Sequence, residues 1–368
     1  MKIICQKEDL QKGVSIVSKA VPAKTTMPIL ECILIDAETD SIKMTANDME
    51  LGIETSITGM IEVPGRIALE AKVFSEIVRR LPDNAVTIET DENYTTTIVC
   101  EKAKFSIPGK AGDDFAYLPQ VEKNQNISLS QFTLKEIIRQ TIFSISDNEN
   151  NKMMSGELME IEKDTLKLVS LDGHRISIRK VQLKEEYDPI KVVIPGKTLS
   201  DVSKILTGDN DSKVELFFTN NHIIFEFDQT TVVSRLIEGE YFRINQMLNS
   251  DYETKLVINK KEFLNCIDRA TLLVKESDKK PLILTITDSN MAVKLNSSLG
   301  SLNEDIAVEK NGKDIKIGFN PKFLTDALRV IDEEMVTLYM VNPKAPCFIR
   351  DEEESYIYLI LPVNFTEE

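Results

Sequence analysis

The sequence lacks the long apolar runs that mark membrane proteins, and its start does not fit the leader segment expected of a secreted protein. No stretch approaches the roughly 18 uninterrupted apolar residues of a membrane span. The opening MKIICQKEDLQ turns acidic after a short apolar run, unlike a secretory signal, and is predicted to be a first strand. With 42% hydrophobic and 28% charged residues in 368 positions, we expect a soluble protein of two or three domains.

Cysteine and histidine are both scarce. The five cysteines are odd in number and scattered, with no spacing typical of a disulfide framework or a zinc site, so a reducing cytoplasm is the expected setting. They are Cys5, Cys32, Cys100, Cys266 and Cys347. There is no nucleophile motif, Gly-rich phosphate loop or metal-ligand cluster. The sequence therefore predicts no catalytic residue, no metal and no cofactor.

Positive charge is also in deficit. Lys and Arg number 44 against 60 Asp and Glu, which gives a net charge of −16. Taken alone, this balance argues against nucleic acid, because phosphate binding normally accompanies an excess of basic residues. Whether the chain binds nucleic acid must therefore be judged from the distribution of charge along it.

What the chain does contain is an internal repeat. KVFSEIVRRL begins at 72, KTLSDVSKIL at 197 and KFLTDALRVI at 322, which places them 125 residues apart each time. Each segment follows a strand-like run and reads as an amphipathic helix. A second helical pattern recurs near the start of each repeat, beginning at 8, 132 and 261.

The segments between these helices are short alternating or apolar runs rich in Val, Ile, Thr, Phe and Tyr, which predict strands. The pattern indicates an α+β fold with three equivalent domains, each with two helices packed on antiparallel sheet. We expect domains at 1–123, 124–250 and 251–368, with polar linkers at 111–126 and 248–255. The repeat alone is equally compatible with a duplication that has no functional content.

The repeated helix presents cations on one face. Positions seven apart lie on the same side of a helix. Lys72 and Arg79 therefore share one side of the helix in the first repeat, opposite its apolar positions. The equivalent residues do the same within each of the other two repeats. An acid beside each pair leaves the three windows at only +2, +1 and +1, whereas the rest of the chain carries −20. Further acids gather at 185–186 and 351–354, which we expect to be loops. A solvated helix face is the alternative interpretation of these cations.

If three such faces closed into a ring, their cations would line one channel and contact phosphates without reading sequence. The predicted DNA-facing residues on or near the helices are Lys12, Lys24, Lys72, Arg79, Arg80, Lys135, Arg139, Lys197, Lys204, Lys322 and Arg329. Other basic residues of the first helices are Lys7, Lys19, Lys260, Lys261 and Arg269.

Four motifs in order, TTMPILECILIDA, LDGHRISI, SRLIEGEYF and the terminal YLILPV, resemble the β subunit of bacterial DNA polymerase III, the sliding clamp. The resemblance covers essentially the whole chain. It implies three clamp-type domains per chain and a head-to-tail homodimer, which forms a six-domain ring around duplex DNA. It also implies partners: the catalytic subunit of the replicative polymerase, the clamp loader, and other replication and repair proteins that carry clamp-binding peptides. No membrane partner is implied, and the location is cytoplasmic, at the nucleoid.

The same resemblance implies a pocket for partner peptides between the second and third domains, mostly apolar as such a groove requires. Its positions are Met154, Leu171, Gly173, His174, Arg175, Ile176, Phe242, Met247, Pro346, Leu359, Ile360, Leu361, Pro362 and Val363. Phe242 replaces a proline common in the family and Asn364 replaces an arginine, so the shape and charge of the pocket depart from the usual pattern.

Two further sites follow from the resemblance. The loop 147–152 corresponds to one that touches DNA, but here it is acidic, and only Lys152 is predicted to do so. The subunit contact would use Phe105 and Ile107 of the first domain with Leu272 and Leu273 of the third, although a core assignment for these apolar residues fits the sequence equally well.

Two alternative hypotheses about function also follow from features of the sequence. Residues 172–175 place His174 beside an acid and a cation, which could perform acid–base chemistry. A repeat scaffold that binds only proteins is the other alternative, and it predicts no dependence on DNA topology.

Overall fold

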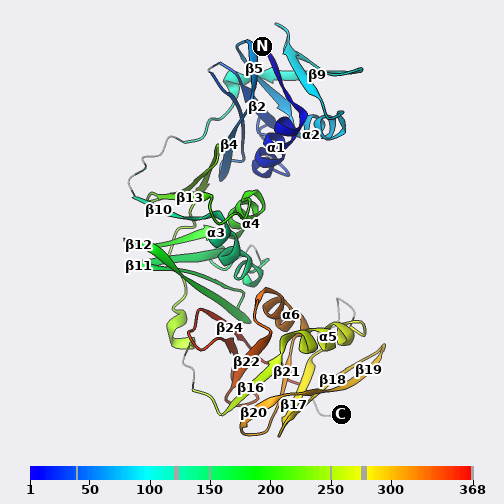
Figure 1. Cartoon of the computed structure of the whole chain (residues 1–368), viewed down its shortest axis with the longest axis vertical. Helices are drawn as coiled ribbons and strands as arrows, with labels where there is room; N and C mark the ends of the chain where they lie inside the picture. The colour runs from blue at the N-terminus through cyan, green and yellow to red at the C-terminus, as the bar shows by residue number, and fades with distance from the viewer. Residues whose placement is uncertain are drawn as a thin grey trace. The chain divides into compact units, whose positions relative to one another are not determined.

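The computed structural model describes residues 1–38, 40–119, 123, 125–148, 151–248, 251–274 and 280–365. The chain forms two compact units, Met1–Leu134 with Asp201–Leu236, and Lys135–Ser200 with Ile237–Glu368 (Figure 1). We refer to them as the first unit and the second unit. Each repeat contributes two α-helices and a set of antiparallel strands, which confirms the predicted α+β class.

The helices confirm the predicted periodicity, since each begins one residue before its expected start. They are α1 (Lys7–Val17), α2 (Ala71–Arg80), α3 (Gln131–Arg139), α4 (Gly196–Ile205), α5 (Lys260–Thr271) and α6 (Pro321–Val330). The side chains of Asn259 and Asn320 cap α5 and α6 by accepting backbone N–H bonds. Helix α2 stops before Pro82, because the residue preceding a proline disfavours helical backbone. Short 3-10 turns are η1 (Ser18–Ala20), η2 (Gly112–Asp114), η3 (Ile142–Ser144) and η4 (Ile244–Met247).

The first unit contains one antiparallel sheet with the strand order β10-β13-β14-β15-β4-β3-β2-β6-β9-β8-β7-β1-β5. Its strands are β1 (Lys2–Gln6), β2 (Cys32–Asp36), β3 (Ile42–Asn47), β4 (Leu51–Ile57), β5 (Gly59–Val63), β6 (Arg66–Glu70), β7 (Ala85–Thr90), β8 (Thr95–Cys100), β9 (Ala103–Ala111), β10 (Gln125–Ser130), β13 (Lys213–Phe218), β14 (His222–Phe227) and β15 (Thr230–Arg235). Pairing of β4 with β15 joins the first repeat to the second and places Ile53 opposite Val232.

The second unit contains a sheet ordered β11-β12-β24-β23-β22-β16-β20 and a four-stranded sheet ordered β19-β18-β17-β21. Their strands are β11 (Gly156–Leu171), β12 (Arg175–Pro195), β16 (Thr254–Asn259), β17 (Leu282–Thr287), β18 (Asn290–Ser297), β19 (Gly300–Ala307), β20 (Glu309–Gly312), β21 (Ile315–Phe319), β22 (Met335–Met340), β23 (Cys347–Arg350) and β24 (Tyr356–Ile360). Pairing of β12 with β24 joins the second repeat to the third and places Ile176 opposite Leu359.

The two junctions use equivalent strands. After the second helix of each repeat come three strands, of which the last is β9, β15 and β24 in turn. The strands that meet β15 and β24 at the junctions are β4 and the first part of β12. Their counterpart in the third repeat is β19, which ends its own sheet.

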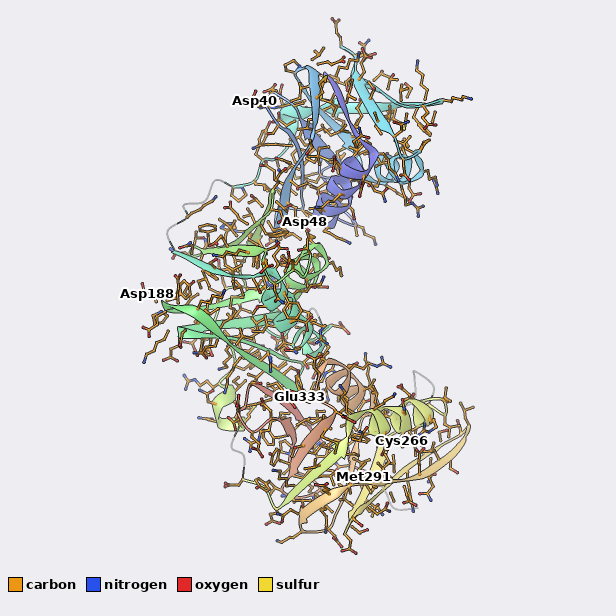
Figure 2. All side chains as sticks on the ribbon, viewed as in Figure 1. Asp40, Asp48, Asp188, Cys266, Met291 and Glu333 are labelled. Atoms are coloured by element: carbon orange, nitrogen blue, oxygen red, sulfur yellow. The ribbon has the colours of Figure 1, made fainter. Side chains whose placement is uncertain are left out.

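Strand β24 separates two apolar cores, because successive side chains on a strand face opposite ways. Tyr358 and Ile360 belong to the core of the third repeat, as do Cys266 of α5 and Met291 of β18 (labelled in Figure 2). Leu359, on the other face, belongs to a second cluster described below. All five cysteines are buried free thiols.

Two expectations were wrong in detail. Glu185 and Glu186 lie within strand β12, not in a loop, because β11 and β12 form one long hairpin that continues through register shifts. The expected linker at 111–126 is shortened from both ends, since Ala111 belongs to β9 and β10 begins at Gln125. Residues 120–122 and 124 of that linker, and 249–250 of the linker at 248–255, lie outside the described residues.

Candidate nucleic-acid and partner interfaces

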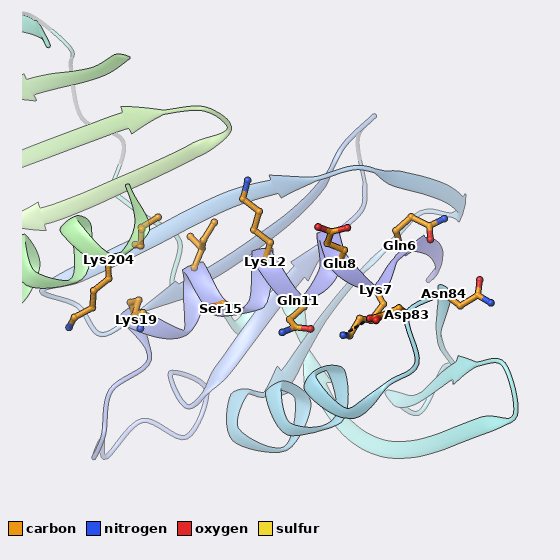
Figure 3. Close-up of a pocket in the computed structure, with 12 residues that line it drawn as sticks. Gln6, Lys7, Glu8, Gln11, Lys12, Ser15, Lys19, Asp83, Asn84 and Lys204 are labelled. Atoms are coloured by element: carbon orange, nitrogen blue, oxygen red, sulfur yellow. Dashed lines mark hydrogen bonds and ion pairs between the residues drawn. The ribbon is translucent and has the colours of Figure 1, made fainter. Parts of the chain in front are cut away.

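A groove of about 920 Å³ runs along α1 in the first unit (Figure 3). Lys7, Lys12 and Lys19 project from α1 or the turn after it, and Lys204 approaches from α4. The ammonium of Lys7 is paired with Asp83, with 2.7 Å between Nζ and Oδ1. Lys204 is paired with Asp201, and Glu8 also lines the groove, so Lys12 and Lys19 leave only a small excess of positive charge. An excess of this sign suits a phosphate-bearing ligand.

The predicted DNA-facing cations are almost all accessible, and they fall into two groups. Those that pair with a carboxylate are Arg79, Arg80, Arg139, Lys204 and Arg329. Within the described part of the chain, no carboxylate forms an ion pair with Lys12, Lys24, Lys72, Lys152 or Lys322. Lys135 and Lys197, the other two, are half-buried and exposed respectively. The exposed surfaces of α2, α4 and α6 therefore carry the cations that the repeat predicted.

The acids beside those cations behave differently in the three repeats. Glu76 accepts a hydrogen bond from Arg79, which lowers the pKa of its carboxyl group, so Glu76 stays ionised and offsets the positive charge. Asp201 pairs with Lys204 in the same way. Asp326 departs from the expectation, because its carboxylate binds Arg175 of β12 instead of a helix cation. The third repeat therefore keeps more of its positive field than the sequence suggested.

The predicted peptide pocket coincides with one face of the β12–β24 sheet. Leu171, Ile176 and Leu359 share an apolar cluster there, with Met154 packed against it. Phe242, Met247 and Leu361 are large exposed hydrophobic residues, and Gly173 and His174 are also exposed. Pro346, Pro362 and Val363 are half-buried, and Ile360 is buried on the opposite side of β24. The structure thus gathers most of the predicted positions into a floor with an exposed rim.

Arg175 supports this face from beneath. Its side chain is only 7% exposed, and its three guanidinium nitrogens donate to Asp172 at 2.9 Å, to Asp326 at 2.7 Å and to the carbonyl of Phe143 at 2.6 Å. The guanidinium carbon also lies 4.5 Å from the ring centre of Phe323. Arg175 therefore ties the loop before β12 to helix α6, and offers little surface to a peptide.

The structure does not support acid–base chemistry at residues 172–175, because Asp172 is bound to groups other than the His174 ring. One carboxylate oxygen of Asp172 accepts from the backbone N–H groups of His174 and Arg175, and the other accepts from the Arg175 side chain. The His174 ring instead lies 6.1 Å from that of Phe323, centroid to centroid. This arrangement builds a turn, and it does not orient a histidine for proton transfer.

The C-terminal segment, which carries the last positions of the predicted pocket, is held by backbone hydrogen bonds after β24 ends. The backbone N–H of Leu361 donates to the carbonyl of His174 at 2.9 Å, and that of Val363 donates to Gly318 at 2.8 Å. A Cβ on Gly318 would lie 2.7 Å from the ring of Phe365, so the ring packs directly on that strand. Asn364 is exposed. In the loop 147–152, positions 149–150 lie outside the described residues, and Lys152 is exposed.

The four predicted subunit-contact residues lie on strand β9 of the first unit and at the end of helix α5 in the second unit. Phe105 is 38% exposed on β9, whose residues 103–107 pair only with β8 among the described strands. Leu272 is 79% exposed at the end of α5. Ile107 and Leu273 are half-buried, and Leu273 packs against the third-repeat core. Burial of an apolar residue in a core therefore accounts for Leu273 in part, but not for Phe105 or Leu272.

Sequence reasoning missed the uncharged polar lining of the α1 groove and the pairing of Lys7 with Asp83. The latter joins residues 76 positions apart, and no local pattern marks it. It also missed Phe348 and Leu248, which belong to or pack against the apolar cluster on the same face of the β12–β24 sheet.

Two features are absent from the described residues. No group of three or more His, Cys, Asp or Glu side chains is arranged to hold a metal ion. No described helix has the length and apolar character needed to cross a membrane.

Three copies of a helix-on-sheet module, joined edge to edge and bearing cations on the helices, define a clamp-type protein. Three family models match in sequence: the N-terminal, central and C-terminal domains of the DNA polymerase III beta subunit, over residues 1–119, 128–242 and 245–364. The chain belongs to this family, the bacterial beta sliding clamps. The family is non-enzymatic and acts in DNA replication; its general partners are a second copy of the chain, DNA and the polymerase.

Individual relatives match this chain over nearly its full length. The beta sliding clamp of Bacillus subtilis is 35% identical, with 99% of this chain and 100% of that protein covered. A crystal structure described as a DNA polymerase III beta subunit from Eubacterium rectale is 69% identical, with a TM-score of 0.95 and 99% and 100% coverage. The sliding clamp structure from Bacillus subtilis is 34% identical, also with a TM-score of 0.95, and both chains are covered completely.

Proposed function

We propose that two copies of this chain close head to tail into a ring that encircles duplex DNA without reading its sequence. The ring tethers the catalytic subunit of the replicative polymerase and other replication and repair proteins, and a clamp loader places it on DNA. We place the protein in the cytoplasm, at the nucleoid. The cations of α2, α4 and α6 and the lysines of the α1 groove would face the phosphates.

The proposal rests mainly on two strand edges, one on β19 and one on β9, that have no partner strand among the described residues. Equivalent strands meet at the β4–β15 and β12–β24 junctions within one chain. The third pair of this kind would join β19 to β9, and β19 ends its sheet while residues 103–107 of β9 pair only with β8 among the described strands. Since unpaired strand edges favour pairing with another chain, β19 of one copy and β9 of the next would complete the set.

The proposed subunit contact predicts that Leu272→Asp yields a monomer. The change places a charge on an apolar side chain that is 79% exposed in the single chain, so it should weaken association and leave thermal stability nearly unchanged. Analytical ultracentrifugation measures the mass. Met335→Asp, an exposed apolar position near the other end of α5, is the matched control and should stay dimeric. A dimeric Leu272→Asp protein would place the contact elsewhere.

The proposed peptide pocket predicts that Leu361→Asp abolishes binding of the polymerase's clamp-binding peptide and leaves the dimer intact. The substitution charges the exposed apolar rim next to Leu359 and His174. Fluorescence anisotropy with a labelled peptide measures the loss, with Val63→Asp on β5 as an exposed control. Removing residues 363–368 should act alike. A monomeric product from either change would show that the terminus supports the fold or the dimer instead.

A further inference from the structure

A second cavity, of about 130 Å³ and smaller than the α1 groove, opens on the same sheet face as the proposed peptide pocket. Ile178, Leu248, Phe348 and Ile357 form its apolar lining, and all four belong to or pack against the cluster that floors the peptide pocket. The cavity approaches the size of engineered cavities, about 150 Å³, that accept a benzene molecule. One apolar side chain therefore fits.

The register of β12 and β24 makes the two pockets neighbours. Ile176 lies opposite Leu359 in the peptide pocket, and Ile178 lies opposite Ile357 in the second cavity. Residues two apart on a strand point to the same face about 7 Å from one another. An extended peptide with one side chain in the first pocket would thus reach the second within two or three residues.

The rim of the second cavity is basic. Lys167, Lys180 and Arg350 line it with only one acid, Glu354, whereas the whole chain carries −16. Lys167 pairs with Glu160 at 2.7 Å.

The other two rim cations differ in how far their charges are compensated. Arg350 is bound to Glu354 and lies 4.7 Å from the Tyr339 ring centre. No carboxylate in the described part of the chain pairs with the half-buried Lys180, whose backbone N–H donates to Ser355. Lys180 therefore offers an uncompensated positive charge next to an apolar cavity.

We propose that this cavity is an accessory subsite that binds an apolar side chain followed by a carboxylate, in the continuation of the partner peptide seated in the first pocket. The inference rests on the proposed peptide pocket. The apolar side chain fills the space among Ile178, Leu248 and Ile357, and the carboxylate pairs with Lys180. Such a subsite favours partners whose clamp-binding segment is extended by an apolar and acidic pair over partners that carry the anchor alone.

The test compares three labelled peptides on the intact dimer by fluorescence anisotropy. One holds only the apolar anchor, and the other two add Leu-Asp two residues beyond it, at the N-terminal or the C-terminal side. One extended peptide should bind about tenfold more tightly than the anchor peptide, because a charge-assisted contact in a partly buried site contributes about that factor. High salt should reduce the gain.

Variants separate this inference from the function on which it rests. Lys180→Met keeps the aliphatic stem and removes the charge. It should therefore remove most of the gain in affinity of the extended peptide and leave the affinity of the anchor peptide unchanged. Lys184→Met, an exposed lysine on the same strand, should preserve the gain. Failure of the anchor peptide to bind the unaltered protein would contradict the peptide pocket itself. Anchor binding with no gain from either extension, or a gain that survives Lys180→Met, would overturn the accessory subsite alone.

Discussion

Replacing Glu157 with Gln should raise the stability of the second unit most at alkaline pH, by roughly 4 kcal/mol near pH 8. Glu157 is fully buried in β11, and burial raises the pKa of its carboxyl group from 4.5 to about 8. The unfolded chain releases this proton above about pH 4.5, whereas the folded chain holds it to about pH 8. The free energy of unfolding should therefore fall as pH rises through that window, and Gln should remove this component.

The local hydrogen bonds offset the burial of the Glu157 carboxyl group only in part. Thr141 Oγ1 lies 2.8 Å from the carbonyl of Ile137 and 3.0 Å from Glu157 Oε2. Thr141 is the donor to both acceptors, and because a hydroxyl has one proton to donate, only one of them can be served at a time. The other oxygen, Oε1, has no partner among the described residues.

Scanning calorimetry from pH 5 to 9 measures the effect. Glu186→Gln, an exposed glutamate of β12, is the matched control and should reproduce the pH dependence of the unaltered protein. If Glu157→Gln kept the same fall in stability with pH, Glu157 would not be the group responsible.

Replacing Arg175 with Ala should have the second large effect and lower the stability of the second unit by about 3 to 5 kcal/mol, the usual result of breaking a buried ion pair. The change leaves the carboxylates of Asp172 and Asp326 without their shared cation, and the carbonyl of Phe143 without its donor. Arg175→Lys should rescue little, because an ammonium cannot replace the planar fork that reaches all three acceptors.

Calorimetry again measures this loss, with Lys322→Ala on the exposed side of α6 as the control. Peptide binding to Arg175→Ala should weaken as the loop before β12 loosens. A variant as stable as the unaltered protein would show that the three contacts of Arg175 contribute nothing net.

The sequence predicted the helices and most strands because their patterns are local. A 3.6-residue period placed the starts of the six described helices within one residue, although the first-helix patterns ran three or four residues beyond the observed ends of α1, α3 and α5. The cation faces followed from the same period, since Lys72 and Arg79 needed only helical geometry to share a side. The extent of β12 did not follow, because its charged middle stretch has the composition of a loop and is held in strand geometry by pairing with β11.

Tertiary partners could not be predicted from one element at a time. Arg175 and Asp326 are 151 residues apart, and each resembles an ordinary surface charge in its own segment. Glu157 is different, because the repeat itself held the signal. Its partner across the sheet is Ile194, two residues before α4, and the same position in the other repeats is Ile33 or Leu282. A comparison of the repeats would have placed Glu157 in an apolar core.

Closure of the proposed ring holds the protein on DNA, because the cations are few and partly paired. Non-specific contacts of this kind give dissociation constants of about 10⁻⁴ to 10⁻⁶ M, too weak for lasting retention. The most direct measurement loads the protein onto nicked circular DNA with a clamp loader and follows its retention by gel filtration before and after the circle is cut. Retention on the circle and loss from the linear form is the predicted result; equal retention on both forms would contradict the ring.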